Sequence, residues 1–435
     1  MTRQAQHSRT ASRIPPRDAA RKEETMDFTI PEEITAVGDA LVRFIDREVV
    51  PLEDEHRELL TNERHLFGPD GRWTDEVRAL KRRVRMRSAE LGFYNLFGPE
   101  SIGGGGLGAL AAVAIQERLN AHCGPERALV HSVVLPSPFT NGLSPVFAHM
   151  DRAVFERYRE GLASGDKTSC FCMSEPDAGS DVYAMKTVAE RDGDGWVISG
   201  TKQWITNSPD ADYAMVFAIT DKEAARNRRG GVTGFFVDTR APGYSVTSVI
   251  PLMGHLGFDI GIVNFDRVRV ADDHRIGPVD RSLSVALDGV SVGRLSMAGS
   301  CIGLAKWALS MATGYAKTRR TFGRPIAEHQ AVQFLLADSA MDIYAAKCMT
   351  QNCAWRIDQG LPAIKEVSMV KAFGTEMLSR VMDRCMEVHG AMGLTNELRL
   401  EAGLRYARIT RVPDGTSQIQ RRTVASRLLD GDDAL

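Results

Sequence analysis

The spacing of apolar residues changes twice along this chain, and that change limits the folds it can adopt. From Ile34 to Ile45 apolar residues recur every three or four positions, as on one face of a helix. Near Thr168 they gather in short runs between turn residues, and from about Val285 the helical spacing returns. Strands and helices do not alternate as they would in a dinucleotide-binding α/β unit. The sequence therefore predicts an α+β chain with an N-terminal helical domain, a middle antiparallel β domain and a C-terminal helical bundle.

The expected elements follow from these two spacings. Helices are predicted over residues 34–45, 76–91, 109–119, 332–344, 363–392 and 417–429. Strands are predicted over residues 195–200, 214–220, 233–237, 246–250 and 262–270. Pro51 is expected to close the first helix, and the glycine run at 103–106 is expected to be a flexible break.

Domain limits are set where the spacing changes. We expect an extension over residues 1–26, the N-terminal helical domain over 27–165, the β domain over 166–275 and the helical bundle over 276–435. The first stretch is rich in arginine among small and polar residues, without an apolar period. It is interpreted as a disordered extension, with a transit peptide or a true start at Met26 as alternatives. The expected location is cytoplasmic, or the mitochondrial matrix if the extension is a transit peptide.

Composition excludes several classes of function. A net charge of −2 over 435 residues gives no basic field for nucleic acid, and no apolar run is long enough to span a bilayer. The seven cysteines are scattered and odd in number, which indicates reduced and mostly buried thiols. No cluster of cysteine and histidine has the spacing of a zinc site, so no metal is expected.

Two neighbouring segments carry candidate cofactor chemistry. Residues 172–181 read CMSEPDAGSD, and residues 204–207 read WITN. The first is a polar loop between two apolar runs, whose amides and hydroxyls could bind ring oxygens or a phosphate. Trp204 could stack on a flat ligand. A polar turn beside a core tryptophan would have the same composition.

Three further segments lie in the C-terminal part. Residues 319–326 read RRTFGRPI, residues 388–393 read VHGAMG, and residues 411–421 read RVPDGTSQIQR. The guanidinium fork of arginine suits bidentate binding of phosphate, although surface arginines at a helix start would look alike. An aspartate before glycine, as at Asp414, is also common in ordinary turns.

Together and in this order, the five segments resemble the acyl-CoA dehydrogenase family of flavin-dependent enzymes. The resemblance covers about residues 30 to 429. It implies one non-covalently bound FAD per subunit, an acyl-CoA substrate and a homo-oligomer, with a tetramer favoured over a dimer. Arg319 and Thr321 would meet the pyrophosphate of a neighbouring subunit's FAD, and Phe322 would line its adenine side. The residues that the resemblance assigns to cofactor binding are Phe171, Met173, Ser174, Gly179, Ser180, Trp204, Thr206, Arg319, Thr321, Phe322, Gln330, Glu387, Gly390, Thr416 and Gln418.

Two positions depart from the family pattern. Family members usually carry Gln where this chain has Glu387, and a carboxylate is unfavourable beside a pyrophosphate. The family's base is usually the Glu of a Glu-Gly-Thr segment, where this chain has Asp414, which is one methylene shorter. The shorter side chain either retracts the base or favours a bulkier acyl group. A second base position known in the family is Gly293 here, so Asp414 is the only inherited candidate.

The resemblance implies a complete reaction. The chain would oxidise an acyl-CoA thioester to the 2-enoyl-CoA, with proton removal by Asp414 and hydride transfer to N5 of the flavin. Arg294 and Gly415 would contact the substrate, and an electron-transfer flavoprotein would accept the electrons. The alternatives are an acyl-CoA oxidase, a nitroalkane oxidase-like enzyme that also uses an aspartate base, and a non-catalytic homologue that keeps the scaffold for binding. No nucleic acid or membrane partner is expected.

Overall fold

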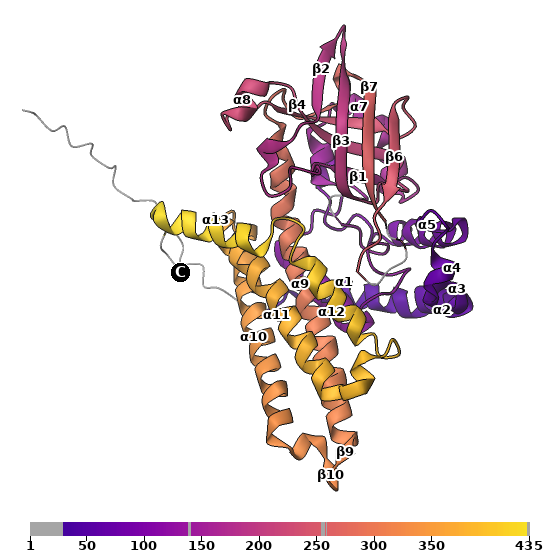
Figure 1. The fold of residues 1–435 in the computed structure, drawn as a ribbon, viewed down its shortest axis with the longest axis vertical. Coiled ribbons are helices and arrows are strands. Elements are labelled where there is room, and N and C mark those ends of the chain that lie inside the picture. Colours follow the sequence, from indigo (N-terminus) through magenta and orange to yellow (C-terminus); the bar gives the residue numbers. More distant parts are fainter. Residues whose placement is uncertain (1–28, 138–140, 254–256, 258, 433–435) are drawn as a thin grey trace, which may run out of the picture.

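The computed structural model describes residues 29–137, 141–253, 257 and 259–432. Figure 1 shows a sheet-rich part at one end, long helices running to the other end, and the N-terminal helices beside them. The expected extension over residues 1–26 lies outside the described residues. Among the helices described, none is both long and apolar enough to cross a membrane. The chain has the predicted class: a helical region, a middle sheet and a C-terminal helical bundle.

The elements fall into three groups along the chain. The N-terminal helices are α1 (Glu32–Phe44), α2 (Val50–Glu55), α3 (Arg57–Thr61), α4 (Glu63–Leu66), α5 (Asp75–Glu90), α6 (Ala109–Cys123) and α7 (Arg152–Ala163). The middle part holds β1 (Ser169–Cys172), β2 (Val188–Asp192), β3 (Gly195–Thr206), β4 (Tyr213–Ile219), α8 (Lys222–Arg226), β5 (Val232–Asp238), β6 (Tyr244–Val249), β7 (Ile260–Ala271) and β8 (Arg275–Ile276). The C-terminal part holds α9 (Ser282–Thr318), β9 (Arg320–Thr321), β10 (Arg324–Pro325), α10 (Gln330–Asp358), α11 (Ile364–His389), α12 (Leu400–Thr410) and α13 (Ser417–Leu429).

The middle sheet has the order β6-β7-β3-β2-β4-β5-β8, with β1 paired to β4. Most pairs are antiparallel as expected, but β1 and β2 each pair with β4 in parallel. All seven residues of β4 are buried because both of its faces are covered. Met215 and Phe217 pack with α7 on one face of β4. Ala214 and Val216, on its other face, pack in a second core formed mainly by apolar residues of the neighbouring strands. A continuous apolar run is the sequence pattern of such a strand.

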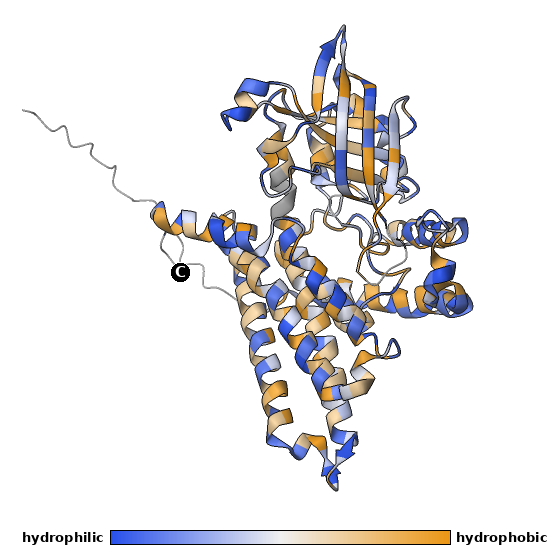
Figure 2. Cartoon of the chain, in the orientation of Figure 1, coloured by the Kyte–Doolittle hydropathy of each residue, from blue (hydrophilic) through white to orange (hydrophobic). Residues whose placement is uncertain are grey.

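The C-terminal helices form one bundle around a shared apolar core. The 37-residue α9 contacts β5 at one end and β10 at the other, so it joins the sheet-rich part to the far tip of the molecule. Figure 2 shows apolar and polar residues interleaved along these helices, as expected when one face is buried and one is exposed. The buried face of α11 includes Val367, Val370 and Leu378, which pack among the neighbouring helices.

Two local expectations were wrong. Pro51 does not close the first helix, because residues 45–49 form a π-helical turn and the chain stays helical to Glu55. Pro51 falls in the first turn of α2, where its missing N–H costs little. The glycine run is not a flexible break either. Gly104 donates to the Pro99 carbonyl, and a Cβ on Gly104 would lie 2.2 Å from the Gly98 oxygen, so only glycine fits this close packing.

Candidate active site

Asp414 lies in the turn between α12 and α13, in a left-handed conformation with φ of 55°, and Gly415 follows with φ of 92°. Aspartate is among the few non-glycine residues that tolerate this region. Three helices hold the turn through its carbonyl groups. Arg294 Nε of α9 donates to the Asp414 oxygen at 2.8 Å, and Lys371 Nζ of α11 donates to the Gly415 oxygen at 2.8 Å. Gln420 Nε2 of α13 donates to both oxygens, at 3.0 and 3.1 Å.

The charges around the turn act on Asp414 in opposite directions. Burial of its carboxyl group raises the pKa of Asp414 above the ordinary value, while Arg294 and Lys371 both oppose that rise. Burial also lowers the pKa of Lys371 to about 8, against the attraction of Asp414. The result is a carboxylate that is more basic than one in water, between two cations that favour its ionised form.

The polar loop after β1 is fixed from beneath by a buried ion pair. Lys202 Nζ on β3 donates to Glu175 Oε1 at 2.8 Å and to the Met173 carbonyl at 3.0 Å. The Glu175 carboxylate also accepts from the backbone N–H groups of Lys186 and Thr187. Both charged side chains are almost fully buried. The loop therefore has one conformation in which Ser174 is partly exposed and Gly179 and Ser180 are exposed.

Trp204 is aimed outward by an irregularity in β3. The pairing of β3 with β7 shifts register between Lys202 and Ile205, and Trp204 has φ of 65°. Bulges of this kind redirect a side chain and are common beside active sites. Trp204 is 53% exposed, and a Cβ on Gly179 would meet no atom within 4 Å. The neighbouring Gln203 N–H donates to the Ser174 carbonyl at 2.9 Å, which ties this part of β3 to the polar loop, and an exposed indole there fits a planar ligand.

A second group of predicted cofactor residues gathers at the tip of the bundle. Thr321, Phe322 and Glu387 line one cavity of about 320 Å³, together with His329, whose Nε2 lies 3.1 Å from Thr321 Oγ1. Phe322, in the turn between β9 and β10, is 97% exposed. Arg319, Gln330 and Gly390 are exposed at the adjoining ends of α9, α10 and α11.

The two groups lie in different parts of the chain: Trp204 and the polar loop belong to the sheet-rich part, and the second group lies at the far tip of the bundle, which is also distant from the Asp414 turn (Figure 1). Arg294, beside Asp414, precedes the end of α9 at Thr318 by 24 residues, which is about 36 Å along a helix. On α11, Lys371 and Glu387 are likewise 16 residues apart, or about 24 Å. One chain therefore does not bring all the predicted cofactor residues around one ligand. Of the remaining predicted residues, Phe171 and Met173 pack partly against the sheet core, Thr416 accepts from the Ile419 N–H as the cap of α13, and Gln418 is exposed.

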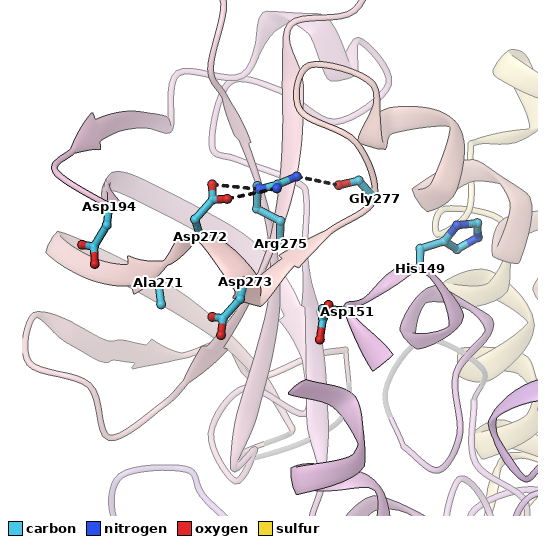
Figure 3. Close-up of a pocket in the computed structure, with 8 residues that line it drawn as sticks. All are labelled: His149, Asp151, Asp194, Ala271, Asp272, Asp273, Arg275 and Gly277. Atoms are coloured by element: carbon cyan, nitrogen blue, oxygen red, sulfur yellow. Dashed lines mark hydrogen bonds and ion pairs between the residues drawn. The ribbon is translucent and has the colours of Figure 1, made fainter. Parts of the chain in front are cut away.

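A separate polar pocket of about 540 Å³ lies against the sheet, far from the base in sequence (Figure 3). Its acidic side chains are largely occupied. Asp272 forms ion pairs with Arg275 and Arg191 and accepts from Trp196, and Asp151 caps α7. His149, Asp194 and Asp273, which also line it, are exposed, so none resembles the Asp414 carboxyl group, whose burial raises its pKa.

Sequence reasoning missed the side chains that support the site. Lys371, Lys202, Glu175 and Gln420 are all buried, and none was predicted. The only signal for Lys371 was its position within an apolar stripe, because Val367, Val370, Gly374 and Leu378 surround it on the buried face of α11. A lysine on such a face is buried only when a specific partner needs it.

Comparison with known proteins gives concordant matches. Two family models match this chain: "Acyl-CoA dehydrogenase, middle domain" over residues 170–268 and "Acyl-CoA dehydrogenase, C-terminal domain" over residues 281–429. The chain is 32% identical to human mitochondrial short-chain specific acyl-CoA dehydrogenase, over 87% of this chain and 91% of that protein. It is 33% identical to the caffeyl-CoA reductase-Etf complex subunit CarC of Acetobacterium woodii, over 82% and 92%. The structure of glutaryl-CoA dehydrogenase from Mycobacterium smegmatis superposes with a TM-score of 0.78 at 26% identity, over 92% and 95%.

Proposed function

This chain belongs to the acyl-CoA dehydrogenase family, and on that premise we propose that it is an FAD-dependent enzyme that oxidises an acyl-CoA thioester to the 2-enoyl-CoA. Asp414 is the base that takes the α-proton. The observation that carries the proposal is the turn at Asp414, whose two carbonyl groups are held by Arg294, Lys371 and Gln420. An ordinary Asp-Gly turn would not need a cation from each of two helices, one of them, Lys371, fully buried.

The chain's own residues account for proton removal. An α-proton beside a thioester is weakly acidic, so the base must be aligned with it and must be stronger than a carboxylate in water. The left-handed turn fixes the direction of the Asp414 side chain, and its burial raises its pKa toward working pH. Arg294 and Gly415 border the same turn and would contact the substrate.

FAD fits the open surfaces of both residue groups. Trp204, Thr206 and the loop from Ser174 to Ser180 would hold the flavin ring, and Arg319, Thr321 and Phe322 would hold the diphosphate and adenine. When bound, FAD supplies the acceptor for the β-hydride. Glu387 lines the cavity at the tip of the bundle. A carboxylate there suits a hydroxyl or amino group of the ligand better than its phosphates.

A second copy of the chain would complete each cofactor site. Trp204 and the loop after β1 belong to the sheet-rich part and Arg319, Thr321 and Phe322 to the tip of the bundle, so the group at the tip would serve the FAD of a neighbouring subunit. Phe334, Met341 and Tyr344 on α10 add an exposed apolar stripe at helical spacing. These features support a homo-oligomer, with a tetramer favoured over a dimer. The electron acceptor would be an electron-transfer flavoprotein; the name of the Acetobacterium woodii relative places that protein in a complex with an Etf.

Asp414→Asn tests the proposal directly. The amide keeps the shape and the turn preference of aspartate but cannot take a proton, so flavin bleaching by substrate should slow by about 10²–10⁴-fold or more. The measurement is anaerobic bleaching of the bound flavin with straight-chain, branched and aryl acyl-CoAs and with nitroalkanes. An Asn variant that bleaches within about threefold of wild type would show that Asp414 is not the base.

Two controls separate the rival activities. Asp414→Glu should lower activity on a bulky best substrate if the short side chain is fitted to it, and should raise activity broadly if it is not. The reduced enzyme can be reoxidised with oxygen or with an electron-transfer flavoprotein, and the two rates compared. An equal rate with oxygen alone would favour an oxidase. Bleaching by nitroalkanes and by no acyl-CoA would favour the nitroalkane reaction.

A further inference from the structure

Three lysines of this chain are fully buried, and one of them differs from the other two. Lys202 forms an ion pair with Glu175 at 2.8 Å, and Lys365 forms one with Asp432 at 2.8 Å. Lys371 instead donates to a backbone carbonyl, that of Gly415, and forms no ion pair with any residue in the described part of the chain. A buried ammonium without a compensating charge is costly.

The missing counter-charge is the base itself. Asp414 is the residue before the Gly415 carbonyl that Lys371 contacts, and its carboxylate is the acidic group that attracts the lysine most strongly. The other charged or titratable groups that face Lys371 are Arg294 and Cys301 of α9 and Arg411 after α12. Two of these three are cations, so Asp414 alone supplies negative charge at neutral pH.

We propose that Lys371 is a positioning residue of Asp414: its ammonium clamps the Gly415 carbonyl and places a positive charge beside the base. This inference rests on the proposed function, because it assumes that Asp414 takes the substrate's proton. The clamp restricts the turn that presents the carboxylate, and the charge favours the ionised form that can accept a proton. Arg294 contributes a second cation but contacts the neighbouring carbonyl, so the two are not interchangeable.

The test is the pH profile of anaerobic flavin reduction in Lys371→Met. A nearby cation typically lowers a carboxyl pKa by about 1–3 pH units. Loss of the charge should therefore move the acid limb of the pH profile upward by about one pH unit. The rate of flavin reduction on the plateau of the profile should fall, because the turn is less well held. The affinity for acyl-CoA should change little. Lys371→Arg keeps the charge and should leave the acid limb in place. Lys371→Gln keeps a donor for the Gly415 carbonyl without the charge, and should move the limb as methionine does.

Lys365→Met is the matched control, because it removes a lysine of equal burial from the same helix. It should lower the thermal midpoint but leave the acid limb unmoved. A folded Lys371→Met or Lys371→Gln enzyme with the wild-type acid limb would overturn the inference, and Lys371→Gln decides it if the methionine variant does not fold. Full activity of Asp414→Asn would instead overturn the proposed function, so the two failures can be told apart.

Discussion

At the scale of single residues, the Glu175–Lys202 pair shows how a buried charge sets the shape of a surface loop. The carboxylate accepts from Lys202 and from two backbone N–H groups, and both side chains are almost fully excluded from water. Replacing one partner would leave the other charge buried alone, which typically costs about 3–5 kcal/mol. The loop from Ser174 to Ser180 would lose its support at the same time.

Lys202→Met should therefore lower the thermal midpoint and release FAD more readily than wild type. Both effects are followed by the rise of flavin fluorescence on heating and on dilution. Lys186→Met is the matched control, because Lys186 pairs with Asp177 on the exposed side of the same loop. The control should behave as wild type. Equal behaviour of the two variants would mean that the buried pair does not shape the flavin site.

Lys371 should give the stability of the chain a distinctive alkaline dependence. Burial lowers its pKa to about 8, from an ordinary 10.5. Between these values the unfolded state binds more protons than the folded state, so this group's contribution to stability rises with pH across that window. Below pH 8 both states are protonated and the penalty of about 3 kcal/mol is fully present. The unfolding free energy of wild type minus that of Lys371→Met should therefore rise by about 3 kcal/mol between pH 8 and pH 10.5. Urea unfolding at a series of pH values measures it.

Asp414 and Lys371 illustrate what a sequence reveals about a site. Asp414 was predicted because it lies in a segment whose neighbours resemble a family motif. Lys371 was missed because its role depends on Gly415, which is 44 residues away in the chain. Local spacing carries no information about such a contact, and it indicates only that a lysine interrupts an apolar face.

At the scale of elements, apolar spacing predicted several helices and strands correctly, although it missed α7 and α12, which also bury one face. The expected helix over 417–429 matches α13, and the strand over 262–270 lies within β7 (Ile260–Ala271). It failed where backbone geometry decides the outcome. A π-helical turn let the chain pass Pro51, and Gly104, Gly105 and Gly106 pack too closely against residues 96–100 to admit a side chain. The short strand β1 was not predicted either, because it is only four residues long.

The β9–β10 hairpin should join cofactor binding to assembly. Arg319 is exposed at its start, and Phe322 at its turn is almost fully exposed in a single chain. Loss of a charge-assisted contact with phosphate costs about 1.5–3 kcal/mol, or roughly tenfold to a hundredfold in affinity. Arg319→Ala should weaken FAD retention by that factor and loosen the oligomer, measured by equilibrium dialysis and by light scattering.

Arg43→Ala is the control for the hairpin, because Arg43 is an exposed arginine on α1. It should retain FAD and assembly as wild type does. If Arg319→Ala also retains FAD with unchanged affinity, Arg319 is an ordinary surface charge and the residues at the tip of the bundle do not bind the phosphates.

At the scale of the whole molecule, we propose that a second chain completes the site. The loop after β1 and Trp204 belong to the sheet-rich part, whereas Arg319, Thr321 and Phe322 lie at the far tip of the bundle, so we expect each FAD to span two subunits. An exposed apolar stripe runs along α10 between the helix start and the middle of the helix, where Phe334, Met341 and Tyr344 are 58%, 63% and 74% exposed. Burial of this stripe against another copy is the contact that we expect to hold the oligomer together.

Charged substitutions on that stripe separate assembly from direct cofactor contact. Met341→Glu and Tyr344→Glu alter no residue assigned to FAD, yet each would bury a carboxylate in the interface between subunits, which is unfavourable without a partner. Both variants should shift toward smaller species in light scattering and should lose FAD on dilution, although the isolated chain stays folded by circular dichroism. Asn227→Glu adds the same charge at an exposed position of the β domain and should leave both properties unchanged. A monomeric variant that still holds FAD with wild-type affinity would show that one chain is sufficient for the cofactor, and the shared site would have to be abandoned.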